Sequence, residues 1–119
     1  MNVSEELQQA IDDSRARLRS GFPLWLRPFL IRDVGAITIG RHIYVKATFG
    51  EDGLERLLRH EIEHVRQINR LGFVRFYIRY GVEYARNRLA GMKSYEAYRS
   101  ISFERDALAA EQVHTNLDV

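Results

Sequence analysis

Residues 54–70, with the sequence LERLLRHEIEHVRQINR, carry the strongest periodic pattern in the chain. Placed on a helix at 100° per residue, the apolar side chains fall in one arc and most of the arginines and glutamates fall opposite. The apolar arc consists of Leu54, Leu57, Leu58, Val65 and Ile68. This spacing predicts a long amphipathic helix that buries one face, so the rest of the fold must supply a surface for that face to cover.

The segment HEIEH, at residues 60–64, places ionisable side chains on this helix. Glu61 falls in the middle of the apolar arc, where a carboxylate is costly unless it is neutralised, hydrogen-bonded or beside a cation. Glu63 falls on the opposite face, where we expect it to be solvated. His60 and His64 lie one turn apart, so both imidazoles can reach a single metal ion.

Two interpretations of HEIEH remain open at this point. The pattern H-E-x-x-H occurs by chance in chains that bind nothing. The helical setting and the inward position of Glu61 favour a metal site, because they explain why a carboxylate stands among apolar residues. In that case Glu61 is the expected general base, while His60 and His64 are the expected ligands.

A catalytic zinc site needs a third protein ligand beside an open position. The chain has no cysteine. Its other histidines are His42 and His114. His42 lies in the predicted hairpin and could face the site, although an exposed turn position is favoured, and His114 near the C-terminus is expected to be solvated. In the segment SISFERDALAAE, Glu104 and Glu111 share a predicted helix face with the small Ala107. Either glutamate could supply the third ligand, and either could instead be an ordinary surface residue.

The remaining sequence predicts one α+β domain over residues 1–119, dominated by helices. A small β-hairpin is expected to precede the HEIEH helix. A first helix is expected over 3–19, capped by Ser4 and ended by Gly21 and Pro23, and it is followed by an extended connector with the sequence FPLWLRPFLIRDVG. The hairpin is expected around Gly40–Arg41. After the HEIEH helix, we expect a helix over 73–89 and a further helix from Ser94, in which Ser102 can cap the second half.

Composition excludes several classes of protein. No run of about 20 apolar residues is present, so no transmembrane helix is expected. The N-terminus is polar and acidic, unlike a secretory signal, and a cytoplasmic location is expected. The net charge is only +2 and the arginines and glutamates are interspersed, which argues against a nucleic-acid-binding surface.

The segment FVRFYIRYGVEYARNRL, residues 73–89, mixes aromatic residues with arginines. This composition is typical of a helix on a membrane surface. It is equally typical of a core helix, and a small domain must bury some such stripe, so we favour packing beneath the HEIEH helix and expect no membrane partner. The residues concerned are Phe73, Phe76, Tyr77, Tyr80 and Tyr84, interleaved with Arg75, Arg79, Arg86 and Arg88.

The stretch from about residue 54 to 111 resembles the small single-domain gluzincin-type metallopeptidases of bacteria and archaea. Those proteins combine HExxHxxQ, a Leu-Gly break, an aromatic helix and a segment Y-x-x-x-x-x-E-x-[ED]-A. The matching residues are His60, Glu61, His64 and Gln67 in the first motif and Tyr98, Glu104, Asp106 and Ala107 in the last. The resemblance implies a minimal zincin-like domain in which His60, His64 and Glu104 bind zinc and Glu61 is the general base.

The resemblance further implies zinc-dependent hydrolysis of a peptide or unfolded protein, with the extended substrate paired to an edge strand of the hairpin. Among Tyr95, Tyr98 and Arg99, Tyr98 fits the family pattern best as donor to the oxyanion. Asp106 or a backbone carbonyl could orient a ligating imidazole. The alternative is a latent or degenerate metal-binding domain that serves as a binding or assembly module, and a second copy of the chain is a candidate partner.

Overall fold

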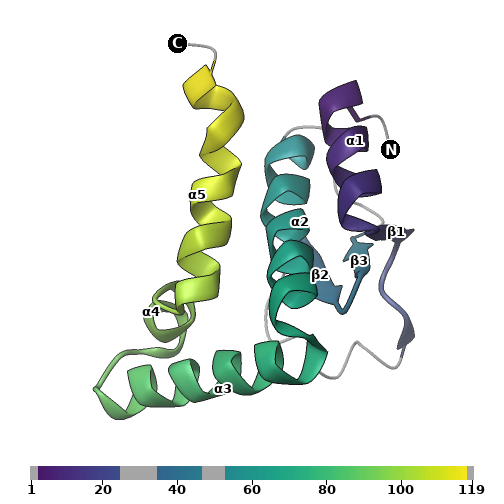
Figure 1. Ribbon diagram of the computed structural model, residues 1–119. Coiled ribbons are helices and arrows are strands. Elements are labelled where there is room, and N and C mark those ends of the chain that lie inside the picture. The colour runs from purple at the N-terminus through teal and green to yellow at the C-terminus, as the bar shows by residue number, and fades with distance from the viewer. Residues whose placement is uncertain (1–2, 25–34, 47–52, 118–119) are drawn as a thin grey trace.

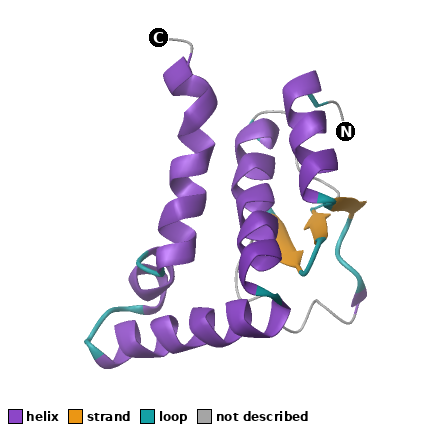
Figure 2. Cartoon of the chain, in the orientation of Figure 1, coloured by secondary structure: helices purple, strands orange, loops and turns teal. Residues whose placement is uncertain are grey.

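The computed structural model describes residues 3–24, 35–46 and 53–117. It is an α+β arrangement dominated by helices, which confirms the fold class expected from the sequence (Figures 1 and 2). In chain order the elements are α1 (Glu5–Ser14), β1 (Arg17–Ser20), β2 (Ala36–Ile39), β3 (His42–Val45), α2 (Leu54–Leu71), α3 (Phe73–Leu89), α4 (Ser94–Arg99) and α5 (Ser102–Leu117).

The three strands form one small sheet in the order β1-β3-β2. The predicted hairpin is confirmed: β2 and β3 are antiparallel, with Ile39 opposite His42. Gly40 sits in the turn at φ 61°, a left-handed conformation that glycine adopts without steric cost. Because β1 pairs on the far side of β3, β2 is an edge strand, and it contacts α2.

The N-terminal helix is shorter than the sequence pattern suggested. Ser4 does cap it, since its hydroxyl accepts a hydrogen bond from the Leu7 amide at 3.2 Å. The helix ends at Ser14 because Arg15 adopts a left-handed conformation, so the expected helical span of 3–19 and its end at Gly21 were wrong. The residues after it pair with β3 as a parallel strand, a non-local contact that a helical periodicity cannot reveal.

Helix α2 is buried over more of its surface than the apolar arc predicted from the sequence. On one side it packs with α1 and the sheet, and on the other with α5, which runs beside it (Figure 1). Ile62, outside the predicted arc, is therefore almost fully buried. The core around α2 consists of Leu7, Ile11, Ile43, Val45, Leu54, Leu58, Ile62 and Val65. This double packing brings the C-terminal part of the chain against the HEIEH segment.

The helix expected from Ser94 is divided into α4 and α5. Ile101, at the break, is fully buried in a second cluster with Ile68, Phe76 and Phe103. Ser102 does not cap α5 with its own hydroxyl. Instead, its amide and hydroxyl both donate to the carboxylate of Glu83 on α3, at 2.9 and 2.8 Å.

Helix α3 buries the aromatic stripe that the sequence indicated. Phe76 is buried, and Tyr77, Tyr80 and Tyr84 pack against the same cluster. Phe73, by contrast, is 54% exposed. Among the described helices, none has both the length and the apolar character needed to cross a bilayer. Most of the connector expected after Pro23 lies outside the described residues.

Candidate metal centre

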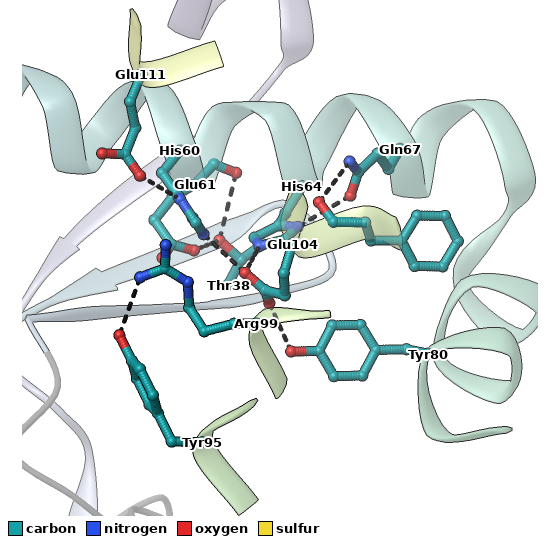
Figure 3. A network of polar contacts seen from close by, with 11 residues as sticks. Thr38, His60, Glu61, His64, Gln67, Tyr80, Tyr95, Arg99, Glu104 and Glu111 are labelled. Atoms are coloured by element: carbon teal, nitrogen blue, oxygen red, sulfur yellow. Dashed lines mark hydrogen bonds and ion pairs between the residues drawn. The ribbon is translucent and has the colours of Figure 1, made fainter. Parts of the chain in front are cut away.

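Two helices bring together the three side chains proposed as ligands. His60 and His64 come from α2, and Glu104 comes from the first turn of α5 (Figure 3). Oε1 of Glu104 lies 2.9 Å from Nε2 of His60 and 3.2 Å from Nε2 of His64. Ligand atoms of a tetrahedral zinc ion are about 3.3 Å apart, which follows from bonds of about 2.0–2.1 Å. The three ligand atoms lie within 4.8 Å of one another, so the cluster could hold one metal ion.

Helix α5 packs against α2, and its small Ala107, one turn after Glu104, is fully buried. Glu104 and His64 are each only 6% exposed. The His60 side chain is 15% exposed, so it forms the side of the cluster nearest to solvent.

The second nitrogen of each imidazole has its own acceptor. Oε2 of Glu111 lies 2.7 Å from Nδ1 of His60, and Oε1 of Gln67 lies 2.9 Å from Nδ1 of His64. The Gln67 amide also donates to the backbone carbonyl of Phe103, next to Glu104, at 3.1 Å. With Nδ1–H donated in this way, both Nε2 atoms are left to face Glu104. Such outer contacts fix the tautomer and orientation of metal-binding histidines.

Glu104 is held from α3 as well. The Tyr80 hydroxyl donates to its Oε2 at 2.5 Å, while Oε1 faces the two histidines. The Tyr80 ring stacks on that of Phe103 at a centroid distance of 6.5 Å. Each of the three candidate ligands therefore has a separate partner that fixes its orientation.

The electrostatics of the cluster favour positive charge at its centre. Burial acts to lower the pKa of His60, but the hydrogen bond to Glu104, the charge of Glu61 and the hydrogen bond to Glu111 raise it to about 9. The pKa of His64 is also raised, because Glu104 and Glu61 outweigh burial. Burial acts to raise the pKa of Glu104, yet the hydrogen bonds from both histidines hold it well below its usual range. The raised pKa values of both histidines show that the cluster favours positive charge, which a divalent cation could supply.

Glu61 faces inward, as the helical pattern predicted. It is 7% exposed, and Oγ1 of Thr38 on β2 donates to its Oε2 at 2.5 Å. Its charge is close enough to raise the pKa of both His60 and His64. A buried carboxylate therefore lies beside the cluster, held by a strand hydroxyl, without being one of its three ligands.

Glu63 is less solvated than expected. Its side chain is 15% exposed, and it forms ion pairs with Arg66 at 3.8 Å and Arg70 at 3.6 Å. The expectation of an ordinary solvated glutamate was wrong in degree, because the long arginine side chains on the same helix face cover it. It remains outside the metal-binding cluster.

Tyr98, a candidate oxyanion donor, lies close enough to the cluster for its charges to act on the phenol. Burial and the neighbouring charges of Glu104 and Glu61 raise its pKa. Tyr95 is 54% exposed and its hydroxyl accepts a hydrogen bond from Arg99, which points its guanidinium to that residue (Figure 3).

Three other sequence candidates are not part of the described cluster. Asp106 is exposed on α5, so the expectation that it orients an imidazole was wrong, and Glu111 and Gln67 occupy those positions. His42 is half-buried beside Tyr44 rather than exposed, with ring centroids 6.2 Å apart. The side chain of His114 lies outside the described residues.

Two site residues were missed by sequence reasoning. Thr38 is the only polar residue in the strand sequence AITI, and that exception was the available signal. Tyr80 was assigned to the aromatic stripe, and its contact with Glu104 depends on the angle at which α3 crosses α5. The helical periodicity of the sequence gives no information on that crossing angle.

Comparison of the chain with protein-family models, with curated proteins and with solved structures finds no match. The function that the cluster supports therefore has to be inferred from its own residues and their geometry.

Proposed function

We propose that this chain is a zinc-dependent peptidase in which His60, His64 and Glu104 hold the metal and Glu61 is the general base. The observation that carries the proposal is the meeting of both Nε2 atoms with one Glu104 oxygen, beside a second buried carboxylate that is not a ligand. Two nitrogen donors and one oxygen donor suit zinc, and cobalt or manganese would also be accepted.

A bound zinc ion would supply Lewis-acid chemistry, polarising a carbonyl and making a water more acidic. Glu61 accepts the proton of the attacking water and delivers it to the leaving amine. Thr38 holds Oε2 of Glu61, which leaves the other carboxylate oxygen for proton transfer. Because Glu61 comes from a rigid helix and Thr38 from a strand, the base is fixed in position before substrate binds.

Tyr98 is our candidate for stabilising the oxyanion that forms during hydrolysis. The phenol is protonated at neutral pH and can donate a hydrogen bond, and its raised pKa extends this to more alkaline solution. The Tyr80 hydroxyl donates to Glu104 at 2.5 Å and so supports the ligand, and a hydrogen bond with Glu104 also contributes to the raised pKa of Tyr98. Substrate would be an extended peptide lying along β2, the edge strand beside Glu61.

One contact favours the alternative of a metal-binding module without proteolysis. The Tyr77 hydroxyl donates to the Thr38 carbonyl at 3.0 Å and accepts from the Gly40 amide at 3.2 Å. Both backbone groups belong to the β2 turn region that an extended peptide would pair with. A peptide could pair only with the part of β2 that precedes Thr38, or it would have to displace Tyr77.

The decisive experiment combines metal analysis with hydrolysis of an unfolded protein substrate. We expect Glu61→Gln to retain one zinc per chain and to lose about 10²-fold or more in kcat/KM. Glu63→Gln, on the same helix, is the matched control and should keep both properties. If wild type binds zinc and cleaves nothing, the binding module is correct. If Glu61→Gln cleaves as fast as wild type, the mechanism is wrong.

A further inference from the structure

Helix α3 has two apolar faces, and the fold buries only one. Figure 1 shows α3 crossing beneath the lower ends of α2 and α5. Phe76 and Tyr80 face the core, and the opposite side of the helix carries a second stripe. We call it the outer stripe, and it comprises Val74, Ile78, Val82, Ala85 and Leu89. Val74, Ile78, Val82 and Leu89 are 65%, 59%, 44% and 89% exposed.

The outer stripe is bordered by positive charge alone. At 100° per residue, Arg75, Arg79 and Arg86 line one edge and Arg88 lies on the other. Glu83 is the only acidic residue of α3, and its carboxylate is turned to α5, where it accepts the amide and hydroxyl of Ser102. The exposed side of α3 is thus apolar along its middle and cationic along its edges.

A hollow of about 400 Å³ lies on the arginine side of the outer stripe. Arg79 and Arg86 line it together with Ile78, Val82, Glu83 and Ser102. Since Glu83 is already bonded to Ser102 and the Arg79 guanidinium lies over the Phe103 ring, two cationic groups line this hollow without a carboxylate that pairs with them among the described residues. An anionic group could lie against them while acyl chains or other apolar groups meet Ile78 and Val82.

We propose that α3 is a membrane-surface helix that docks this chain, through the outer stripe, onto an anionic lipid surface. Apolar residues along one face with arginines at its borders are what such helices use, and each basic residue near an anionic surface adds to the attraction. A second copy of the chain is a poorer occupant, because pairing two such stripes would bring arginine rows together without acids to match them. The expectation from the sequence that no membrane is a partner considered only the aromatic stripe of α3. The structure leaves the outer stripe exposed on the same helix.

Docking through the outer stripe would leave the metal centre free. Tyr80 projects from the opposite side of α3 and reaches Glu104, so the cluster lies on the side away from the lipid. The proposal does not depend on zinc or on hydrolysis, and it can hold if the proposed peptidase activity does not.

Co-sedimentation with vesicles tests the proposal directly. The full chain is mixed with phosphatidylcholine vesicles or with vesicles containing about 30% phosphatidylserine, for which the surface potential is strongly negative. We expect wild type to pellet with the anionic vesicles and much less with the neutral ones, and high salt to weaken binding. Ile78→Ser with Val82→Ser should lower the partition coefficient by about tenfold or more.

Charge is tested separately, in positions that make no core contact. Arg75→Glu with Arg86→Glu should abolish the preference for anionic vesicles, and these exposed residues are chosen because Arg79 stacks on Phe103. The matched control is Arg17→Glu with Arg19→Glu, on the exposed side of β1, which should bind like wild type. Circular dichroism on heating verifies that each variant folds, and Val74→Ser replaces any that does not.

Several outcomes overturn the proposal. Wild type that stays in the supernatant, equal binding to both vesicle types, or stripe variants that bind like wild type would each do so. Sedimentation equilibrium that finds a dimer, dissolved by the Ile78→Ser and Val82→Ser changes, would assign the outer stripe to a second copy. Binding of an acidic helical peptide with no lipid binding would assign it to a protein partner.

Discussion

Oε2 of Glu111 lies 2.7 Å from Nδ1 of His60, on the ring nitrogen that does not face Glu104. Sequence spacing left Glu104 and Glu111 as rivals for the third ligand position. The two carboxylates instead contact opposite nitrogens of one imidazole. Glu104 shares the centre with His64, whereas Glu111 orients His60 from outside, in the way that carboxylates commonly support metal-binding histidines.

Removing Glu111 should weaken metal binding without abolishing it. We expect Glu111→Ala to retain one zinc per chain with an affinity about 10–100-fold lower, because His60 loses its orienting acceptor. Glu104→Ala should lose zinc at the same concentration. Glu96→Ala, exposed on α4, is the control. Competition against a chromophoric chelator measures all three, and zinc loss in Glu111→Ala with full retention in Glu104→Ala would reverse the assignment.

Gln67 should matter for stability as well as for metal binding. It is fully buried and joins His64 to the Phe103 carbonyl. Gln67→Leu leaves that carbonyl and the His64 Nδ1–H without partners, so we expect a loss of about 1–3 kcal/mol in the free energy of unfolding. Gln9→Leu, on the exposed side of α1, should change it by less than about 0.5 kcal/mol. Urea denaturation of the metal-free proteins measures the difference, and equal stabilities would contradict the role given to Gln67.

Much of this site was predictable because α2 is a regular helix. The periodicity of that helix is enough to place Glu61 inward and His60 beside His64. Glu104 follows from the same periodicity in α5 together with the family resemblance. Local sequence was sufficient wherever the relevant contacts lie within three or four residues on one helix.

Contacts between elements were not predictable in the same way. Thr38 reaches Glu61 because β2 is the sheet edge beside α2, and Tyr80 reaches Glu104 because α3 turns under α5. The strand after Ser14 was missed for a related reason: its pairing with β3 overrode a helical pattern that continued to Leu18. Such contacts depend on packing angles and on strand order in the sheet. The spacing of residues along one element carries no information on either.

The metal-free protein should be most stable in mildly acidic solution. The folded-state pKa of His60 is raised from 6.5 to about 9, so its contribution is complete below pH 6.5 and is lost as pH rises toward 9. The pKa of Glu104 is lowered from 4.5, so its contribution is present above pH 4.5 and is lost in stronger acid. We therefore expect a stability maximum between pH 4.5 and 6.5, measured by urea denaturation in chelator.

Zinc should change this profile because it competes with the protons of His60 and His64. Its affinity should rise with pH up to about 9, and binding at pH 7 should release protons. Calorimetry in buffers of different ionisation enthalpy measures the number released. Metal-free protein that gains stability between pH 6.5 and 9, or zinc binding without proton release, would contradict the charge arrangement described for the cluster.

Tyr80 and Tyr98 should separate metal binding from catalysis. Tyr80→Phe removes the donor to Oε2 of Glu104, so we expect zinc affinity to fall about tenfold. Tyr98→Phe should lower kcat by about 10²-fold with little change in KM, because an oxyanion donor acts only in the transition state. Chelator competition and steady-state hydrolysis give the two readouts for each variant.

Tyr84→Phe, whose hydroxyl contacts only Ser94 among the described side chains, should match wild type in both assays. A Tyr98→Phe protein with normal kcat would remove Tyr98 from the mechanism, and a Tyr80→Phe protein with normal zinc affinity would show that Glu104 needs no support from α3.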